Sequence, residues 1–204
     1  MKVLNLYAGI GGNRKLWPDT LPNGEKVEIT AVEIDPQIAE CYKRHFPNDT
    51  VIIGDAHQYL LEHFKEFNFI WSSPPCQTHS RARQVQAGNR LSAKYPDMKL
   101  WQEIIFLKHH AKSNYVVENV IPYYKPLIEP SFAIHRHLFW SDKFMFTVDF
   151  DFLNLEFLKI REAEKTLGFD VSNIAASKKR QVLRNCVLPE LGKYVFQNVV
   201  GVEK

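Results

Sequence analysis

Short apolar runs alternate with amphipathic segments along the first 120 residues of the chain. Runs over residues 2–7, 27–32, 51–53, 67–71 and 114–117 have the length and composition of buried strands. Between them, residues 36–46, 57–64 and 97–112 carry apolar side chains at helical spacing. Strands that alternate with helices predict an α/β fold with a doubly wound, mostly parallel sheet.

The pattern changes after residue 130. Residues 131–140 read as one strand, which would place His135 and His137 on the same face because side chains alternate along a strand. Phenylalanines alternate with other residues over 144–152, which predicts a further strand packed in the core. We expect short helices over residues 161–167, ended by Gly168, and over 178–195, interrupted at Pro189.

Glycines and acids follow the first three predicted strands. The glycine-rich segment 8–12 lets the backbone turn sharply and approach a ligand, although Arg14 occupies the third glycine position of the dinucleotide fingerprint GxGxxG. Glu33 ends the second strand, where an acid can accept hydrogen bonds from ribose hydroxyls. Asp35 is the better candidate for a helix N-terminal acid. With Asp55 after the third strand, these residues predict an adenosine pocket.

A cysteine follows the fourth predicted strand. Two prolines, Pro74 and Pro75, stiffen the approach to Cys76, and polar neighbours over 77–80 argue against burial. Cys76 is therefore a candidate nucleophile, with an ordinary buried cysteine as the alternative. Glu118 follows the fifth strand and should face the same edge of the sheet, which makes it a candidate general acid. The alternative for Glu118 is a structural salt bridge.

Size and composition are those of a single globular domain over residues 1–204. The chain has 204 residues, of which 45% are apolar and 24% charged. No stretch has the length of a transmembrane helix and no signal peptide is evident, so we expect a cytoplasmic protein. The three cysteines form no CxxC pair and the pair His135 and His137 has no evident third ligand, so no disulfide framework and no metal are expected.

Positive charge is concentrated after the candidate nucleophile. Five basic residues and one acid lie between residues 78 and 99, whereas the whole chain has a formal net charge of +3, so the remainder sums to −1. A basic loop in this place would suit a substrate with a phosphate backbone. The alternative is a solvated loop without a ligand.

Taken in order, these segments resemble the motifs of the DNA cytosine-5 methyltransferase family. Residues 6–12 resemble its cofactor-binding motif, with Tyr7 where phenylalanine is usual, and residues 74–77 (PPCQ) match its nucleophile motif. Further matches are residues 33–35, 54–56, 118–120 (ENV), 161–163, 167–169, and 185–187 with Pro189. The resemblance covers nearly the whole chain.

The resemblance implies a Rossmann-like class I fold that uses S-adenosylmethionine to methylate C5 of cytosine in DNA. The thiolate of Cys76 would add to C6 of a flipped cytosine, and Glu118 would stabilise the adduct at N3. Three alternatives remain. They are methylation of transfer RNA, as in one branch of the family, a catalytically silent regulatory subunit and, least favoured, NAD-dependent oxidoreduction.

The resemblance also assigns roles to individual residues. Catalytic roles are expected for Cys76, Glu118, His137 and Gln77. Cofactor binding is expected for Tyr7, Ala8, Gly9, Ile10, Gly11, Gly12, Glu33, Ile34, Asp55, Ala56, Pro75, Leu100, Asn185, Cys186 and Val187. Nucleic-acid binding is expected for Ser80, Arg81, Arg83, Arg90 and Lys94.

The chain departs from the family pattern in two places. His135, Arg136 and His137 stand where the family has Arg-x-Arg, so we expect His137 to replace the second arginine and Arg136 to point to the opposite face of the strand. Only residues 141–160 separate the eighth and ninth motifs, too few for a target-recognition domain, while 161–204 should close the cofactor site. We therefore expect weak or very short sequence specificity, reliance on the basic loop, or recognition supplied by a second copy or another protein. Binding to DNA would associate the protein with the nucleoid.

Overall fold

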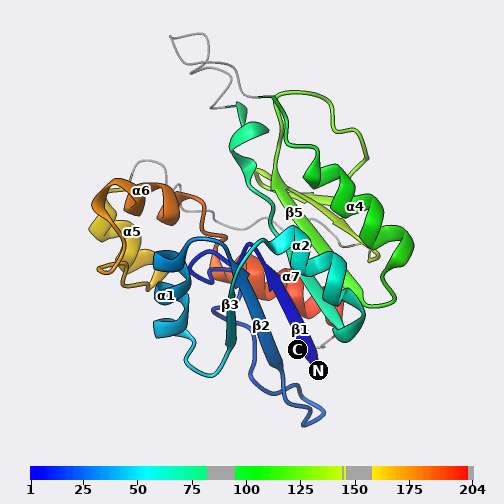
Figure 1. Ribbon diagram of the computed structural model, residues 1–204, viewed down its shortest axis with the longest axis horizontal. Coiled ribbons are helices and arrows are strands. Elements are labelled where there is room, and N and C mark those ends of the chain that lie inside the picture. Colours follow the sequence, from blue (N-terminus) through cyan, green and yellow to red (C-terminus); the bar gives the residue numbers. More distant parts are fainter. Residues whose placement is uncertain (82–94, 144, 146–157, 202–204) are drawn as a thin grey trace.

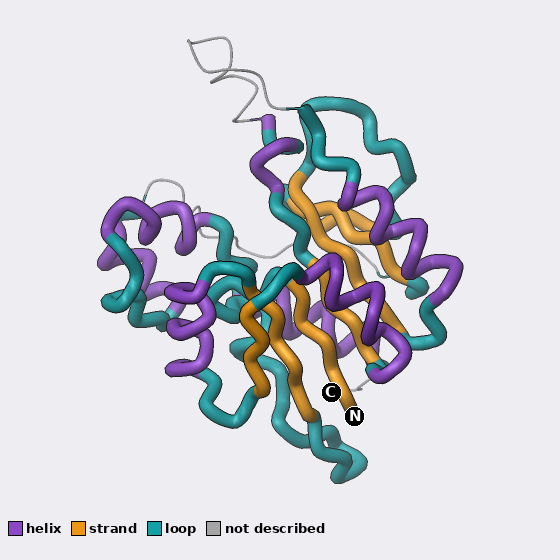
Figure 2. Tube along the Cα trace, in the orientation of Figure 1, coloured by secondary structure: helices purple, strands orange, loops and turns teal. Residues whose placement is uncertain are grey.

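A mostly parallel sheet forms the centre of the molecule in the computed structural model, which describes residues 1–81, 95–143, 145 and 158–201 (Figures 1 and 2). In the described residues the strand order is β3-β2-β1-β4-β5-β7-β6. The first five of these strands run parallel, and the last two are antiparallel to their neighbours. The strands are β1 (Lys2–Leu6), β2 (Glu28–Glu33), β3 (Thr50–Ile53), β4 (Phe69–Ser72), β5 (Asn114–Val120), β6 (Phe132–Ile134) and β7 (His137–Ser141). This topology confirms the predicted doubly wound α/β class.

Helices cover both faces of the sheet. One face packs against α2 (Ala56–His63) and α4 (Lys99–His110) through Leu60, Ile104 and Leu107, all almost fully buried. The other packs against α7 (Pro189–Val200). Each face of the sheet carries its own hydrophobic cluster, and successive residues of a strand point alternately into one and the other. Both sides of the central strands are therefore apolar, which is why these strands read as continuous apolar runs. The remaining described helices are α1 (Pro36–His45), α5 (Ile160–Leu167) and α6 (Ala176–Arg184), with short 3₁₀ turns η1 (Phe64–Glu66) and η2 (Cys76–Thr78).

Local signals place several helix ends as predicted. Asp35 caps α1, accepting a hydrogen bond from the Gln37 amide at 2.9 Å, and Pro36 is the first helical residue. Gly168 ends α5 with φ of 66°, in the left-handed region that glycine adopts without strain. Asp55, which was expected only in the adenosine pocket, caps α2 in the same way as Asp35 caps α1.

The single strand predicted over residues 131–140 is wrong. The chain instead forms an antiparallel hairpin of β6 and β7, with Ile134 paired to His137. His135 and Arg136 make the turn, where His135 has φ of 53°. The two histidines therefore do not share a strand face, because the chain reverses between them. Alternation along a sequence does not reveal a reversal at which no glycine or proline stands.

Two further boundaries differ from the prediction. β5 continues through Glu118 to Val120, because β7 pairs with its last five residues and extends the strand. Pro189 does not interrupt a helix but begins α7, after a break that follows the end of α6 at Arg184. Proline is favoured at a first helical position because its missing N–H has no partner there in any case.

Several predictions fall outside the described residues. These are the roles of Arg83, Arg90 and Lys94 and most of the aromatic segment 144–152, of which only Met145 is described, as a buried residue. The single-domain organisation of residues 1–204 and the reduction of the target-recognition region to residues 141–160 stay predictions. Within the described residues, no helix is both long and apolar enough to cross a membrane.

Candidate active site

The glycine-rich segment leaves β1 through backbone conformations that side chains disfavour. Tyr7 has φ of 53°, Gly9 of 56° and Gly11 of 87°. A Cβ at Gly11 would overlap the ring of Phe46, and one at Gly12 would overlap the carbonyl oxygen of Val187. At Gly9, by contrast, no described atom lies within 4 Å of that position. The segment is therefore packed at one end and open at Gly9, where a ligand can approach the backbone.

Acidic residues stand at the ends of the two strands on one side of β1, at Glu33 of β2 and at Asp55 after β3. Glu33 accepts hydrogen bonds from the amides of Gly9 at 2.9 Å and Asp35 at 3.0 Å, and only 8% of its surface is exposed. The next side chain, Ile34, is 67% exposed although apolar. Asp55 caps α2 and lies 3.4 Å from the ammonium of Lys99. An open glycine, an acid and an exposed apolar side chain fit the ribose and base of an adenosine.

Cys76 begins the turn η2 after β4, and its loop is held to the end of β5. The side-chain amide of Asn119 donates to the carbonyl of Pro74 at 2.9 Å, and the amide of Tyr123 donates to the carbonyl of His79 at 3.0 Å. Burial raises the pKa of the Cys76 thiol to about 11. The negative charge of Glu118 acts in the same direction.

Glu118 is itself paired with a histidine. Nδ1 of His137 lies 2.6 Å from Oε1 of Glu118, with side chains 12% and 7% exposed. This pairing holds the carboxylate at the same sheet edge as Cys76. Arg136, expected on the opposite strand face, lies in the hairpin turn instead, and its charge, like that of Arg184, lowers the pKa of Cys76 against the larger effects that raise it. The prediction for Arg136 was wrong because it assumed a continuous strand.

The other predicted residues fall into three groups. Ala8, Ile10, Ala56, Leu100 and Val187 are buried in the packing around the glycine-rich segment and α4. Pro75 and Asn185 are exposed, while Gln77 and Cys186 are partly exposed. Ser80 forms a bridge with Pro122, and Nε of Arg81 donates to the Pro122 carbonyl at 3.3 Å. These positions locate the residues without testing their predicted roles.

One buried acid was missed by the sequence analysis. Glu103 on α4 is 0% exposed and hydrogen-bonds to Tyr7, His57 and Ser72. The available signal was a carboxylate at a core-facing position of an amphipathic helix, since Leu100, Ile104 and Leu107 share that face.

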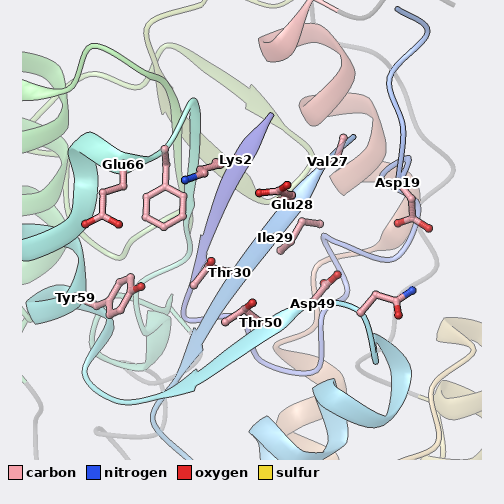
Figure 3. A pocket seen from close by; sticks show the side chains of 12 residues that line it. Lys2, Asp19, Val27, Glu28, Ile29, Thr30, Asp49, Thr50, Tyr59 and Glu66 are labelled. Atoms are coloured by element: carbon pink, nitrogen blue, oxygen red, sulfur yellow. The ribbon is translucent and has the colours of Figure 1, made fainter. Parts of the chain in front are cut away.

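A hollow of about 430 Å³ lies elsewhere on the molecule (Figure 3). It is lined by the first residues of β1, β2 and β3, including Lys2, Glu28 and Thr50, with Tyr59 opposite them. Cys76 and the glycine-rich segment follow the other ends of the parallel strands, so this hollow is at the opposite edge from the candidate site. Among the described residues, no group of three or more His, Cys, Asp or Glu could hold a metal ion.

Parts of the chain are similar to known proteins. A tRNA (cytosine(38)-C(5))-methyltransferase of Spodoptera frugiperda is 35% identical over 82 residues, which cover 39% of this chain and 24% of that protein. The enzyme of the same name from Rattus norvegicus is 33% identical over 84 residues, or 40% of this chain and 21% of the relative. The matches thus span about a quarter or less of these relatives. The structure of the S. pombe Dnmt2 methyltransferase aligns with a TM-score of 0.43 at 17% identity, covering 69% of this chain and 48% of that one.

A family model gives broader coverage. The model described as C-5 cytosine-specific DNA methylase matches residues 1–125, from β1 through the nucleophile loop and β5. That range is more than half of the 204-residue chain. The chain therefore belongs to the family of C-5 cytosine-specific DNA methylases, whose methyl donor is S-adenosylmethionine.

Proposed function

We propose that the chain methylates C5 of cytosine in a nucleic acid through a covalent bond from Cys76 to C6 of the base. The geometry that carries this proposal is the pairing of β4 with β5. Cys76 follows β4, Glu118 lies near the end of β5, and the neighbouring Asn119 donates to the Pro74 carbonyl at 2.9 Å. Bound S-adenosylmethionine would supply an electrophilic methyl group. The open backbone at Gly9 and the acid Glu33 would hold its adenosine portion.

The protonation state of Glu118 links the two catalytic groups. A protonated Glu118 can donate a hydrogen bond to N3 of cytosine, stabilising the charge that develops when sulfur bonds to C6. Protonation also removes the negative charge that raises the pKa of Cys76. The form of Glu118 that assists the base is therefore also the form that favours the thiolate. His137, whose Nδ1 lies 2.6 Å from Oε1 of Glu118, fixes the orientation of the carboxyl group for both roles.

The remaining steps restore the aromatic base. Addition of sulfur to C6 makes C5 an enamine carbon, which takes the methyl group from the sulfonium donor. Loss of the C5 proton and cleavage of the bond between sulfur and C6 then release Cys76 and the methylated base. A cytosine in a duplex must leave the base stack to reach the thiol.

Two substrates are supported by different findings. The named relatives are transfer RNA methyltransferases, which favours RNA over the DNA substrate that the sequence motifs first suggested. The family model, which covers more of the chain, is described for DNA. Phosphate-backbone contacts suit either polymer, so an experiment has to distinguish RNA from DNA as the substrate.

Covalent trapping tests both the chemistry and the substrate. With S-adenosylmethionine present, the protein should form a denaturation-resistant adduct with 5-fluorocytosine in transfer RNA or in duplex DNA, because fluorine cannot leave C5 as a proton does. Cys76→Ser should abolish the adduct, whereas Cys41→Ser should retain it, because Cys41 is a packing residue in a separate cluster. Absence of an adduct with both polymers, using folded protein and saturating cofactor, would refute the proposed function.

A further inference from the structure

A single buried carboxylate on α4 connects three segments that are distant in the sequence. Oε1 of Glu103 accepts a hydrogen bond from the Tyr7 hydroxyl at 2.5 Å and lies 2.9 Å from Nδ1 of His57. Its other oxygen accepts from the Ser72 hydroxyl at 2.7 Å. Because Glu103 is 0% exposed, these contacts replace the water that an ionised carboxylate would otherwise require.

Each partner of Glu103 stands at the edge of a predicted functional segment. Tyr7 follows β1 and opens the glycine-rich segment. His57 lies in the first turn of α2, two residues after Asp55. Ser72 ends β4, four residues before Cys76. The carboxylate therefore joins the cofactor side of the site to the approach of the nucleophile.

The Tyr7 contact depends on a hydroxyl. A phenylalanine at this position would have none to donate to Glu103. Tyr7 also has φ of 53°, a conformation that costs free energy for a residue with a side chain and that the bond to Glu103 helps to hold. The hydrogen bond to Glu103 raises the pKa of His57, so this contact too is favoured by charge.

We propose that Glu103 is a positioning residue that couples cofactor binding to the placement of Cys76, through Tyr7 on one side and Ser72 on the other. The inference rests on the proposed function, because it assigns Tyr7 to the cofactor site and Cys76 to the nucleophile. S-adenosylmethionine bound at the glycine-rich segment would fix the position of Tyr7. Because Tyr7 and Ser72 bond to the same carboxylate, the end of β4 would then be held in place as well.

The chemistry of the three contacts defines informative substitutions. Glu103→Gln keeps the side-chain shape and one carbonyl oxygen, and the hydroxyl of Ser72 can accept a bond from the new amide. Glu103→Leu leaves the buried Ser72 hydroxyl and the partly buried groups of Tyr7 and His57 without this partner, which is far more disruptive. Tyr7→Phe and Ser72→Ala each remove one hydroxyl and leave the carboxylate in place.

The test compares the alkylation rate of Cys76 by iodoacetamide with and without saturating S-adenosylhomocysteine, resolved from the other cysteines by mass spectrometry. A coupling between two sites should change this rate about fivefold or more in the natural protein. Tyr7→Phe should weaken S-adenosylhomocysteine binding about fivefold, the typical effect of one lost hydrogen bond. Tyr7→Phe and Ser72→Ala should each reduce the coupling, and Glu103→Leu should abolish it. Glu103→Gln should keep most of the coupling seen in the natural protein.

Ser131→Ala is the matched control for Ser72→Ala. It removes a hydroxyl that bonds to the carbonyl of Ser141 at 2.8 Å, away from both functional segments, and should leave the coupling unchanged. If Glu103→Leu does not fold, the two hydroxyl deletions still decide the question. Coupling that is absent in the natural protein, or that survives in both Tyr7→Phe and Ser72→Ala, overturns the inference.

Failure of this inference can be told apart from failure of the proposed function. Neither ligand binding nor alkylation requires a nucleic acid or a methyl transfer. Covalent adducts without coupling would leave the methyltransferase proposal intact and refute the role of Glu103. Coupling without adducts on RNA or DNA would refute the methyltransferase proposal and leave the link from Glu103 to Cys76 intact.

Discussion

Replacing Glu118 by glutamine should make Cys76 more reactive and the protein less active. The substitution keeps the size of the side chain and removes its negative charge. That charge is the second cause, after burial, that raises the pKa of Cys76 from an ordinary 9.0 to about 11. Without it, the pKa of Cys76 should fall, because a thiolate is no longer formed beside a carboxylate.

The size of the effect follows from these values. The total rise is two pKa units, from 9.0 to about 11, and burial accounts for more of it than Glu118 does. Because Glu118 is the smaller of the two causes, we expect a fall of at most about one unit and an increase of at most about tenfold in the thiolate population at any pH well below the pKa. General acid catalysis contributes about a hundredfold or more, so methyl transfer should fall by that factor while thiol reactivity rises.

The assay is the alkylation rate of Cys76 as a function of pH, since the thiolate is the reacting form. Glu129→Gln makes the same chemical change at an exposed site paired only loosely with Lys125, at 3.6 Å, and should leave the profile unchanged. Arg136→Gln should move the pKa of Cys76 upward, because the Arg136 charge lowers it. An unchanged or higher pKa in Glu118→Gln would refute the electrostatic link between the two catalytic groups.

Three further predictions concern the segments around the site. Gly12→Ala should lower the free energy of unfolding by about 1–3 kcal/mol in urea titrations, because its Cβ has no room. Gly9→Ala should cost about 1–2 kcal/mol through its left-handed φ of 56°, and it should also weaken S-adenosylhomocysteine binding, because its Cβ would enter the open space. Equal effects of the two substitutions on binding would contradict this difference. Arg14→Met should cost about 3–5 kcal/mol of stability, because it leaves Asp49, with a side chain only 5% exposed, without its guanidinium partner at 3.1 Å. Partial recovery in the double variant with Asp49→Asn would support that cause, and additive losses would count against it. Burial raises the pKa of Cys41 to about 11, so the stability it contributes is present below its ordinary pKa near 9 and is lost as pH rises through 11. The melting temperature should fall over that window, and less steeply in Cys41→Ala.

Much of the fold could be predicted because its signals are local. The parallel strands are buried on both faces, so they appear in the sequence as short apolar runs. Asp35 and Pro36 mark the start of α1, and Gly168 marks the end of α5, because capping depends on neighbouring residues alone. In a parallel sheet the strand ends share one edge, which brought Cys76 and Glu118 into the same hypothesis.

The contacts that shape the site depend on distant partners. The hairpin turn at His135 and Arg136 gives no glycine or proline signal, so the sequence suggested a continuous strand and a wrong direction for Arg136. The pair of Glu118 and His137 is made by β5 and β7, whose antiparallel register also carried β5 beyond its predicted end.

The class of fold, the helix ends at Asp35 and Gly168 and the set of polar residues that follow the parallel strands could all be predicted from the sequence. Which of those residues touch one another is set by the packing of the folded chain. Tyr7 and Glu103 are 96 positions apart, and Glu103 and Ser72 are 31 apart, yet they share one buried hydrogen-bond network. Periodicity reports which side of an element faces the core, whereas the partner found there is set by packing between elements.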